Sequence, residues 1–394
     1  EVHAILVRSR YLEKNNVAIN ALVDMYAKCG LLKEAQDIFD DHKDPDVVSW
    51  TILITGYVQH GFDNEGLNCF ERMQANGLSP SAITFASVLR ACGATGAVEK
   101  GKDVHALIIR EGLLENDTVL RNALIYMYAK TGLLGNVEEL FDKFVIRDDV
   151  SWNTVILGYA QHGSGEKALK YFAQMQCEGF CPDTVTFSAI LKVCGIMGDT
   201  KRGHQLHARI LRDECLAKEI MIANALMDMY TKCGRITKAQ LVFDELPAKD
   251  VASWNTLIAG YAQTGNDDFV FLLFEEMITQ GKQPDFVTFT HVLNTCNHSG
   301  ELDKGQAYFH IMITSYGLIP TLEQYTCTLD LFARVGHLDY AVGIIEKMPF
   351  VASLSAWHSL LSACQKWGNV ELGICAFEHT VQLDENDASA YVCM

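Results

Sequence analysis

The sequence repeats itself at an offset of 102 residues, and this periodicity limits the chain to a repetitive architecture. Residues 20–30 return as 122–132 and again as 224–234. Single residues keep the same offset: Trp50, Trp152 and Trp254; Cys92, Cys194 and Cys296; Asp46, Asp148 and Asp250. Independent globular domains would not repeat in this way, so the chain is expected to be built from stacked units.

Each block of 102 residues divides into units of 31, 35 and 36 residues. Within 118–148, apolar residues recur at three- and four-residue spacing on both sides of Gly132, which is typical of two helices joined by a turn. One such hairpin cannot bury its apolar face alone, so we predict an all-α, right-handed superhelical solenoid of stacked αα-hairpin repeats. The predicted units are 16–46, 47–81, 82–117, 118–148, 149–183, 184–219, 220–250, 251–285, 286–321 and 322–353.

The two ends of the chain depart from the regular pattern. Residues 1–15 match the second half of a long unit, and 354–387 form a divergent unit that begins Leu-Ser-Ala-Trp. Residues 388–394 begin a further unit, so the sequence is expected to be a fragment of a longer protein. Its first residues show no targeting pattern from which a compartment could be read.

Composition excludes several classes of function. The 49 acidic and 32 basic residues leave a net charge of −17, which argues against nucleic-acid binding through bulk charge. No stretch approaches 18 apolar residues, so no contact with a membrane is expected. The 13 cysteines of this loop-poor chain do not suggest a disulfide framework, and those that follow the repeat are expected to be small buried residues.

Motifs that would indicate catalysis are incomplete. The segment 96–101 is similar to a phosphate-binding loop but lacks the Ser or Thr and the preceding strand, so we interpret it as a turn between helices. Cys177 and Cys181 have no second pair at zinc-site spacing. The zinc deaminase signature is absent as well. We therefore predict no enzyme activity in this chain, no metal site and no cofactor.

The alternation of short, middle and long units resembles a known repeat family. With Val-Ser-Trp-Asn-Thr at 150–154 and Asn-Ala-Leu-Ile-Tyr-Met-Tyr-Ala-Lys at 122–130, nearly the whole chain is similar to pentatricopeptide repeat proteins of the plant PLS subfamily. The C-terminal units resemble the E-type motifs of organellar RNA editing factors. The resemblance implies single-stranded RNA as partner, read one base per repeat upstream of a cytidine that is converted to uridine. It also implies a mitochondrion or chloroplast as location, and editing-complex proteins recruited through 354–394.

Candidate base-reading residues recur at fixed positions of each unit. Positions 2, 5 and 13 of the first helix fall within an arc of about 80° and so form one stripe. An Asn amide offers a donor and an acceptor to the edge of an unpaired base. The predicted readers at position 5 and the last position are Asn20 with Asp46, Thr51 with Ser81, Asn122 with Asp148, Asn153 with Asp183, Asn224 with Asp250, Asn255 with Asp285, and Thr290 and Thr326. Val17, Val48, Val119, Val150, Met221 and Ala252 at position 2 are predicted to sandwich bases, and Lys28, Lys130, Lys232 and Arg334 at position 13 to contact phosphates.

Under the family's code, Asn with a final Asp favours uracil and Thr leans to a purine, which gives a predicted preference of 5′-U-R-N-U-U-N-U-U-N-N-3′. A helix cap or a solvated polar position is the alternative interpretation of each Asn, and a solvated lysine near the helix end is that of each Lys. We interpret Trp50, Trp152 and Trp254 as core between units rather than as stacking platforms. The alternative function is a protein-binding α-solenoid of tetratricopeptide type, which the acidic charge favours; a deaminase activity would depend on sequence beyond Met394.

Overall fold

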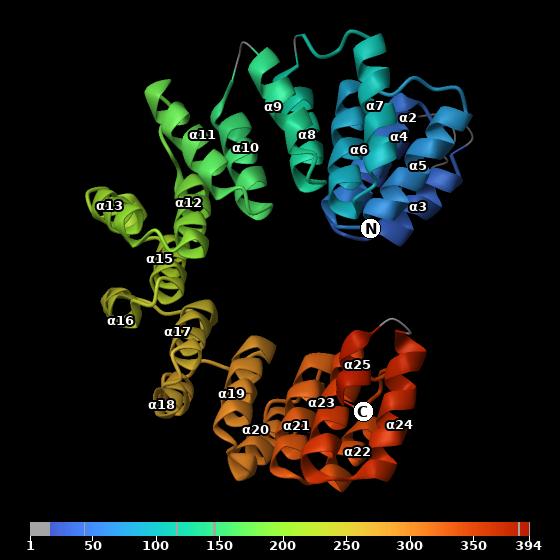
Figure 1. Cartoon of the computed structure of the whole chain (residues 1–394). Coiled ribbons are helices and arrows are strands. Elements are labelled where there is room, and N and C mark those ends of the chain that lie inside the picture. The colour runs from blue at the N-terminus through green and yellow to red at the C-terminus, as the bar shows by residue number, and fades with distance from the viewer. Residues whose placement is uncertain (1–15, 43, 116, 145–146, 385–386, 394) are drawn as a thin grey trace. The chain divides into compact units, whose positions relative to one another are not determined.

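The structure is a computed structural model that describes residues 16–393 except 43, 116, 145–146 and 385–386. The predicted half-unit 1–15 lies outside the described residues. Within the described residues there are 24 helices and no strand, which confirms the all-α prediction (Figure 1). The helices are α2 (Asn16–Lys28), α3 (Leu32–Asp40), α4 (Val47–Gln59), α5 (Asp63–Ala75), α6 (Ala82–Thr95), α7 (Val98–Arg110), α8 (Thr118–Lys130), α9 (Leu134–Lys143), α10 (Asp149–Gln161), α11 (Gly165–Cys177), α12 (Thr184–Met197), α13 (Thr200–Ile210), α14 (Glu214–Ala217), α15 (Ile220–Lys232), α16 (Ile236–Glu245), α17 (Val251–Gln263), α18 (Asp267–Thr279), α19 (Phe286–Ser299), α20 (Leu302–Thr314), α21 (Leu322–Val335), α22 (Leu338–Lys347), α23 (Leu354–Trp367), α24 (Val370–Leu383) and α25 (Ala388–Cys393).

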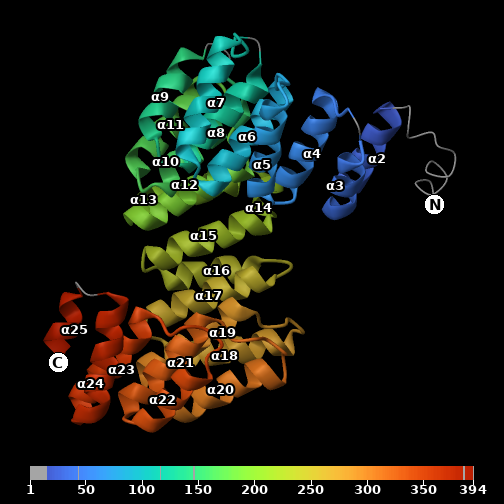
Figure 2. The ribbon, with the colours of Figure 1, turned by 90° about the vertical axis from the view of Figure 1, so that its right-hand side faces the viewer.

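The helices group into two compact units, Glu1–Val193 and Cys194–Met394, and each is a stack of hairpins. In the first, the first helices α2, α4, α6, α8 and α10 pack one on the next, and α3, α5, α7, α9 and α11 each pack on the first helix of their own hairpin. In the second, α15, α17, α19, α21 and α23 form the layer of first helices, and the hairpins can be followed along Figure 2. This layering confirms the solenoid of αα-hairpins.

One helix was not predicted. The short helix α14 lies between α13 and α15, where the sequence indicated only a connection. Its cause is local, because the Asp213 carboxylate accepts from the backbone N–H groups of Cys215 and Leu216 at 3.0 and 3.3 Å and so caps a single turn.

Tryptophans at the start of the middle units form the core between hairpins. Trp50, Trp152 and Trp254 are at most 1% exposed. Each packs edge-on against a phenylalanine in the second helix of the preceding hairpin, with ring centroids 4.6 Å apart for Phe39–Trp50 and 4.7 Å apart for Phe141–Trp152 and Phe243–Trp254. Such contacts add about 1 kcal/mol each to the burial of the ring itself. The interpretation of these tryptophans as core between units is confirmed.

Glycines at position 10 of the middle units allow the first helices to approach closely. A Cβ atom at Gly158 would lie 2.7 Å from the Ala129 Cβ atom, a distance that real Cβ contacts do not show. The same is true of Gly56 against Ala27, also at 2.7 Å. Beside this contact, the His162 Nε2 atom lies 2.7 Å from the Ala129 carbonyl oxygen, within hydrogen-bonding distance. Small residues and this hydrogen bond therefore fix the spacing of α8 and α10.

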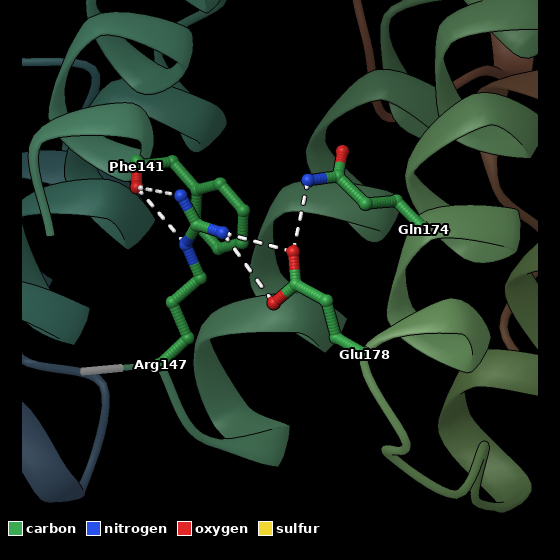
Figure 3. Close-up of polar contacts among 4 residues, drawn as sticks. All are labelled: Phe141, Arg147, Gln174 and Glu178. Atoms are coloured by element: carbon green, nitrogen blue, oxygen red, sulfur yellow. Dashed lines mark hydrogen bonds and ion pairs between the residues drawn. The ribbon is translucent and has the colours of Figure 1, made fainter. Parts of the chain in front are cut away.

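Arg147 links two consecutive hairpins behind the first-helix layer (Figure 3). Its Nε and Nη2 atoms donate to the Phe141 carbonyl at 3.3 and 3.2 Å, and its Nη1 atom donates to Glu178 Oε1 at 3.1 Å. Gln174 holds the same carboxylate through a hydrogen bond of 3.0 Å. The guanidinium also lies over the Phe141 ring, 4.6 Å from its centroid. A largely buried cation thus connects the end of one hairpin to α11 of the next.

Substituting Arg147 by methionine is expected to loosen this junction. Loss of these hydrogen bonds and of the ring contact should lower the free energy of unfolding by about 1–2 kcal/mol. The effect is this large because Arg147 is mostly buried, so solvent weakens its contacts only in part. Hydrogen exchange should accelerate in α9 and α11 and stay unchanged in α2 and α3. The same substitution at the exposed Arg110 is the control, and equal exchange in both variants would contradict a linking role.

Candidate functional site

The structure places every predicted Asn beside its predicted Asp. The Asn Nδ2 atom donates to the carboxylate at the last position of the same unit in all five cases. The distances are 3.5 Å for Asn20–Asp46, 3.1 Å to each oxygen for Asn122–Asp148, 2.9 Å for Asn153–Asp183, 3.4 Å for Asn224–Asp250 and 3.0 Å for Asn255–Asp285. Two residues that are 26 or 30 positions apart in the sequence thus form one polar group. Asn20 and Asn255 are less exposed, at 9% and 8%, than the other three.

Each of these aspartates is also the N-cap of the next first helix. Asp148 has an extended backbone (φ −126°, ψ 173°), and its carboxylate accepts from the Ser151 backbone N–H and hydroxyl. The same arrangement recurs at Asp46, Asp183, Asp250 and Asp285. The helix cap is therefore the Asp of each group and not the Asn for which a cap was the alternative interpretation, and one carboxylate serves both hairpins.

The third residue of the unit that follows each short or middle unit belongs to the same polar group, which sequence reasoning missed. It is Ser49, Ser151 and Ser253 after the short units and Thr84, Thr186 and Thr288 after the middle units. The signal was present in the sequence, because a polar residue three positions after an N-cap is typical of a capping box. Its structural role extends beyond the cap, as the threonines show.

Threonines divide the Asn–Asp pairs into two kinds. In the middle units, the single hydroxyl proton of Thr186 or Thr288 lies between two acceptors, the Asp carboxylate of the N-cap and the Oδ1 atom of Asn153 or Asn255. In the short units the residue is serine, and the buried Oδ1 atoms of Asn20 and Asn224 have no hydrogen-bond partner. A buried acceptor without a donor costs about 1–3 kcal/mol. An N–H group supplied by a ligand would relieve that cost.

The threonine readers are arranged differently from the Asn–Asp pairs. The hydroxyls of Thr51 and Ser81 both contact Thr84 Oγ1, at 2.7 and 2.9 Å, so a third residue joins them. Thr290 accepts from Gln324 Nε2 at 2.7 Å. The Thr326 hydroxyl donates to the carbonyl of Leu322 in its own helix, at 2.8 Å. Thr51 and Thr290 thus lie in polar networks between hairpins, whereas this bond of Thr326 stays within one helix.

The position-2 residues form a row of exposed apolar side chains. Val17 is 78% exposed and Val119 is 67% exposed. Val48, Val150, Met221 and Ala252 are exposed as well. The long units add members that were not predicted, namely Ile83, Val185 and Val287. Large apolar residues exposed at a regular interval indicate a contact surface rather than a core.

Three cavities lie between adjacent first helices at the same register. Their volumes are about 430 Å³ between α2 and α4, about 240 Å³ between α8 and α10, and about 310 Å³ between α21 and α23. Each is lined by positions 9 and 13 of one first helix and by positions 6, 9, 10 and 13 of the next. The largest of the three is also lined by Val48 and Ile83 from position 2 and by Thr51 and Ser81, the predicted readers of that unit.

Three of the four predicted phosphate-contacting cations, Lys28, Lys130 and Arg334, line these cavities. Lys28 and Arg334 line two of them and pair with an acid four residues earlier, Asp24 at 2.7 Å and Asp330 at 3.1 Å. Lys232 pairs in the same way with Asp228, and Lys130 instead donates to Gln161 at 3.3 Å. Exposed pairs of this kind contribute little to stability. The cations are therefore available to a stronger anion.

The pKa values of the five aspartates are lowered from the ordinary 3.8. Burial alone would raise each pKa, but hydrogen bonds from the Ser or Thr and from the Asn amide together outweigh burial. A lowered folded-state pKa means that the stabilisation is complete above about 3.8 and is lost as the pH falls through the folded-state value. The junctions between hairpins are therefore expected to weaken in acid.

Substituting Asp148 by asparagine should isolate this effect at one junction. At pH 7 the wild-type chain should be more stable than the variant by about 1 kcal/mol, because hydrogen bonds to a charged carboxylate are stronger. Urea denaturation between pH 7 and pH 2 should show this difference shrinking below about pH 3.8. A difference that stays constant across that range would contradict the role given to the charged carboxylate.

Other candidate sites are accounted for by the fold. Gly96 ends α6 with a left-handed φ of 71° and α7 begins at Val98, so only 96–97 form the predicted turn between helices, and 98–101 are the first turn of α7. Cys92, Cys194 and Cys296 are buried, and burial raises the pKa of their thiols to about 11, 11 and 12. In the part of the chain that the structure describes, no group of three or more His, Cys, Asp or Glu residues is arranged to hold a metal ion. Among the same residues, no helix has the length and apolarity needed to cross a membrane.

Sequence profiles match the same repeats. The profile of the PPR repeat family matches residues 45–94, 147–195 and 249–298, and that of the PPR repeat matches 17–41, 119–148 and 222–251. Together these matches cover more than half of the chain.

Relatives in plants match nearly the whole chain. A mitochondrial pentatricopeptide repeat-containing protein of Arabidopsis thaliana is 36% identical over 391 residues, which are 99% of this chain and 56% of that protein. A chloroplastic one from the same plant is 35% identical over 394 residues, or 100% of this chain and 48% of that protein. The chain spans about half the length of the curated relatives it matches.

Solved structures share the architecture. The pentatricopeptide repeat protein PPR10, in a crystal structure with an 18-nt psaJ RNA element, aligns over 95% of this chain and 56% of its own, with a TM-score of 0.72 and 18% identity. PPR10 from maize in another crystal structure aligns over 99% of this chain and 67% of its own, with a TM-score of 0.56 and 18% identity. At this level of identity, the likeness shows a shared fold.

Proposed function

The chain belongs to the pentatricopeptide repeat family, and we propose that it binds single-stranded RNA sequence-specifically, one base per repeat. The observation that carries the proposal is the recurrence of five Asn–Asp groups at one register of the first-helix layers. Scaffolding of proteins would not require these groups. The crystal structure of PPR10 with an RNA element supports the proposal by analogy of fold.

The Asn–Asp geometry favours uracil over cytosine. The carboxylate holds one N–H of the Asn122 amide, which prevents the amide from flipping and leaves Oδ1 and the second N–H for a ligand. Uracil presents an N–H group beside a carbonyl. Its N–H can donate to the Asn Oδ1 atom, and its carbonyl can accept from the second N–H of the amide. Cytosine has an unprotonated N3 at that place, so the Asn oxygen would lose its donor. A mismatch of this kind costs about 1–3 kcal/mol per base, taking the magnitude known for DNA readout.

The exposed position-2 residues supply the stacking surface. A base placed between Val48 and Ile83 would enter the cavity of about 430 Å³ and face Thr51 and Ser81 on its floor. We propose a purine at this site. In order along the first helices, the proposed preference is 5′-U-R-N-U-U-N-U-U-N-N-3′.

We infer further that the RNA is an organellar transcript with a cytidine to be edited to uridine. The support is the alternation of 31, 35 and 36 residues and the likeness of 354–394 to E-type motifs. Relatives named mitochondrial or chloroplastic support an organelle as the location. In this proposal the chain positions the transcript, and editing-complex proteins bind 354–394. Loss of conversion at one organellar cytidine in plants that lack the protein would test the editing role.

Selection from a random pool of single-stranded RNA tests the binding proposal directly. Uracil should be enriched at positions 1, 4, 5, 7 and 8 of a ten-nucleotide site and a purine at position 2. The net charge of −17 favours the competing function, a protein-binding scaffold. Absence of any enriched RNA motif would favour that scaffold.

A further inference from the structure

The hairpin of α23 and α24 continues the register of the first-helix layer. The Trp367 Nε1 atom donates to the Ala333 carbonyl at 3.1 Å. This hydrogen bond occupies the place at which His60 contacts the Ala27 carbonyl and His162 contacts the Ala129 carbonyl, both at 2.7 Å. Helix α23 packs on α21 as the earlier first helices pack on each other. The unit 354–387 is therefore placed like a member of the array.

His358 and Asp387 occupy the two reading positions of this unit. They are its fifth and its last residue, and His358 Nε2 bonds to Asp387 Oδ2 as the asparagines bond to their aspartates. Asp387 also accepts from the Ser389 backbone N–H at 3.0 Å, at the start of α25. The His358 side chain is 24% exposed and lines the cavity between α21 and α23, so its ring can meet a ligand there. A His–Asp group thus stands where the other units carry Asn–Asp.

The cavity beside His358 is lined by two cationic side chains, whereas each of its counterparts is lined by one. The two other cavities carry a lysine and a glutamine at position 13 of their two helices, Lys28 with Gln59 and Lys130 with Gln161. This one carries Arg334 and Lys366. Its volume of about 310 Å³ exceeds that of the cavity between α8 and α10, at about 240 Å³.

One acid, Asp330, lines the same cavity but is already engaged. Its Oδ2 atom accepts from Arg334 Nε at 3.1 Å and from Asn297 Nδ2 at 2.5 Å. The Lys366 ammonium donates to the Arg334 carbonyl at 3.3 Å, and both residues line this cavity from position 13 of their helices. A phosphate bridging Arg334 and Lys366 would gain charge-assisted hydrogen bonds from both.

We propose that the unit 354–387 binds one further nucleotide of the RNA, 3′ of the ten already assigned, with His358 against the base and Arg334 and Lys366 on its 5′ phosphate. The inference rests on the proposed RNA binding and extends its footprint into the region otherwise assigned to protein partners. An imidazole ring stacks on any base or bonds to its edge. The eleventh nucleotide therefore contributes through a phosphate contact and a base contact that can be measured separately.

The experiment compares three kinds of RNA on the purified chain by fluorescence anisotropy. They are a ten-nucleotide RNA of the selected sequence with a free 3′ hydroxyl, the same RNA with an abasic eleventh nucleotide, and eleven-nucleotide RNAs ending in each of the four bases. One phosphate contact to a single strand should strengthen binding about fivefold at 0.1 M salt, because each contributes roughly 0.7 to the log–log salt slope. The preferred base should add about a further tenfold through contact with the ring.

Variants separate the two contributions. Lys366→Gln should abolish the gain from the abasic eleventh nucleotide, whereas Lys347→Gln, an exposed lysine on the second helix α22, should leave it intact. His358→Ala should abolish only the gain from the base. His358→Asn should restore that gain with uracil preferred, because it creates an Asn–Asp group.

The outcomes separate this inference from the function on which it rests. Equal affinity for the ten- and eleven-nucleotide RNAs would overturn the eleventh site and leave 354–387 as a protein-binding surface. Failure of the ten-nucleotide RNA to bind better than a scrambled one would instead overturn the proposed function. A gain that survives both Lys366→Gln and His358→Ala would place the eleventh nucleotide elsewhere and contradict the inference.

Discussion

Substituting Asn122 by threonine, with Asp148 kept, is expected to move the preference at the fourth base from uracil to a purine. Threonine introduces a hydroxyl at position 5 and removes the amide that Asp148 holds through both oxygens at 3.1 Å. Binding to RNA with uracil at that base should weaken by about 1–3 kcal/mol, or roughly 5- to 150-fold. Competition between RNAs that differ only at the fourth base would measure the change.

The control for this swap lies in the same hairpin. Asn136 is exposed on the second helix α9, away from the first-helix layer. Asn136→Thr should leave affinity and base preference unchanged. Preference at the neighbouring bases should also persist in Asn122→Thr, since each group faces its own nucleotide. An equal loss of affinity for all RNAs in Asn122→Thr would show that Asn122 supports the fold and does not read a base.

Substituting Gly158 by valine should cause a large loss of stability at the first-helix layer. The new side chain would start 2.7 Å from Ala129 Cβ and 3.4 Å from the Ala129 Cα atom, and the backbone cannot move away without separating α8 from α10. Overpacking of this kind costs about 3 kcal/mol. Because a solenoid depends on contacts between neighbouring units, hydrogen exchange should accelerate first in α8 to α11.

Gly135 supplies the matched control, because nothing lies within 4 Å of a Cβ atom built there in α9. Gly135→Ala should be neutral or stabilise the chain by up to about 1 kcal/mol, since alanine has less backbone freedom to lose when the unfolded chain forms the helix. Gly158→Val should also reduce RNA affinity, because Gly158 lines the cavity between α8 and α10. Similar stability of the two variants would contradict the close approach of these helices.

The pattern of hairpins was accessible from the sequence because it depends on local periodicity. Each of the units proposed between 16 and 353 contains a first and a second helix. The exception is the additional turn of α14, which depends on the single cap at Asp213. The tryptophans were placed in the core because they sit at a fixed place in every middle unit.

The candidate site was accessible only in part. The pairing of position 5 with the last position followed from the resemblance, and the structure brings each Asn and Asp together. The bridging role of Thr186 and Thr288 did not follow, because a capping residue does not reveal which side chain of the preceding hairpin it touches. The His358–Asp387 group was missed because 354–387 had been set apart as a divergent unit.

The order of the residues alone determined that this chain forms repeated hairpins and which positions of each hairpin are equivalent. Helical periodicity and turn chemistry are properties of neighbouring residues, so they can be read along the chain. The tertiary structure decided which hairpins share a polar group, which Asn oxygens remain without a donor, and that α23 keeps the register of α21. These features depend on distances between helices, and those distances are set by the sizes of side chains that meet only after the hairpins stack.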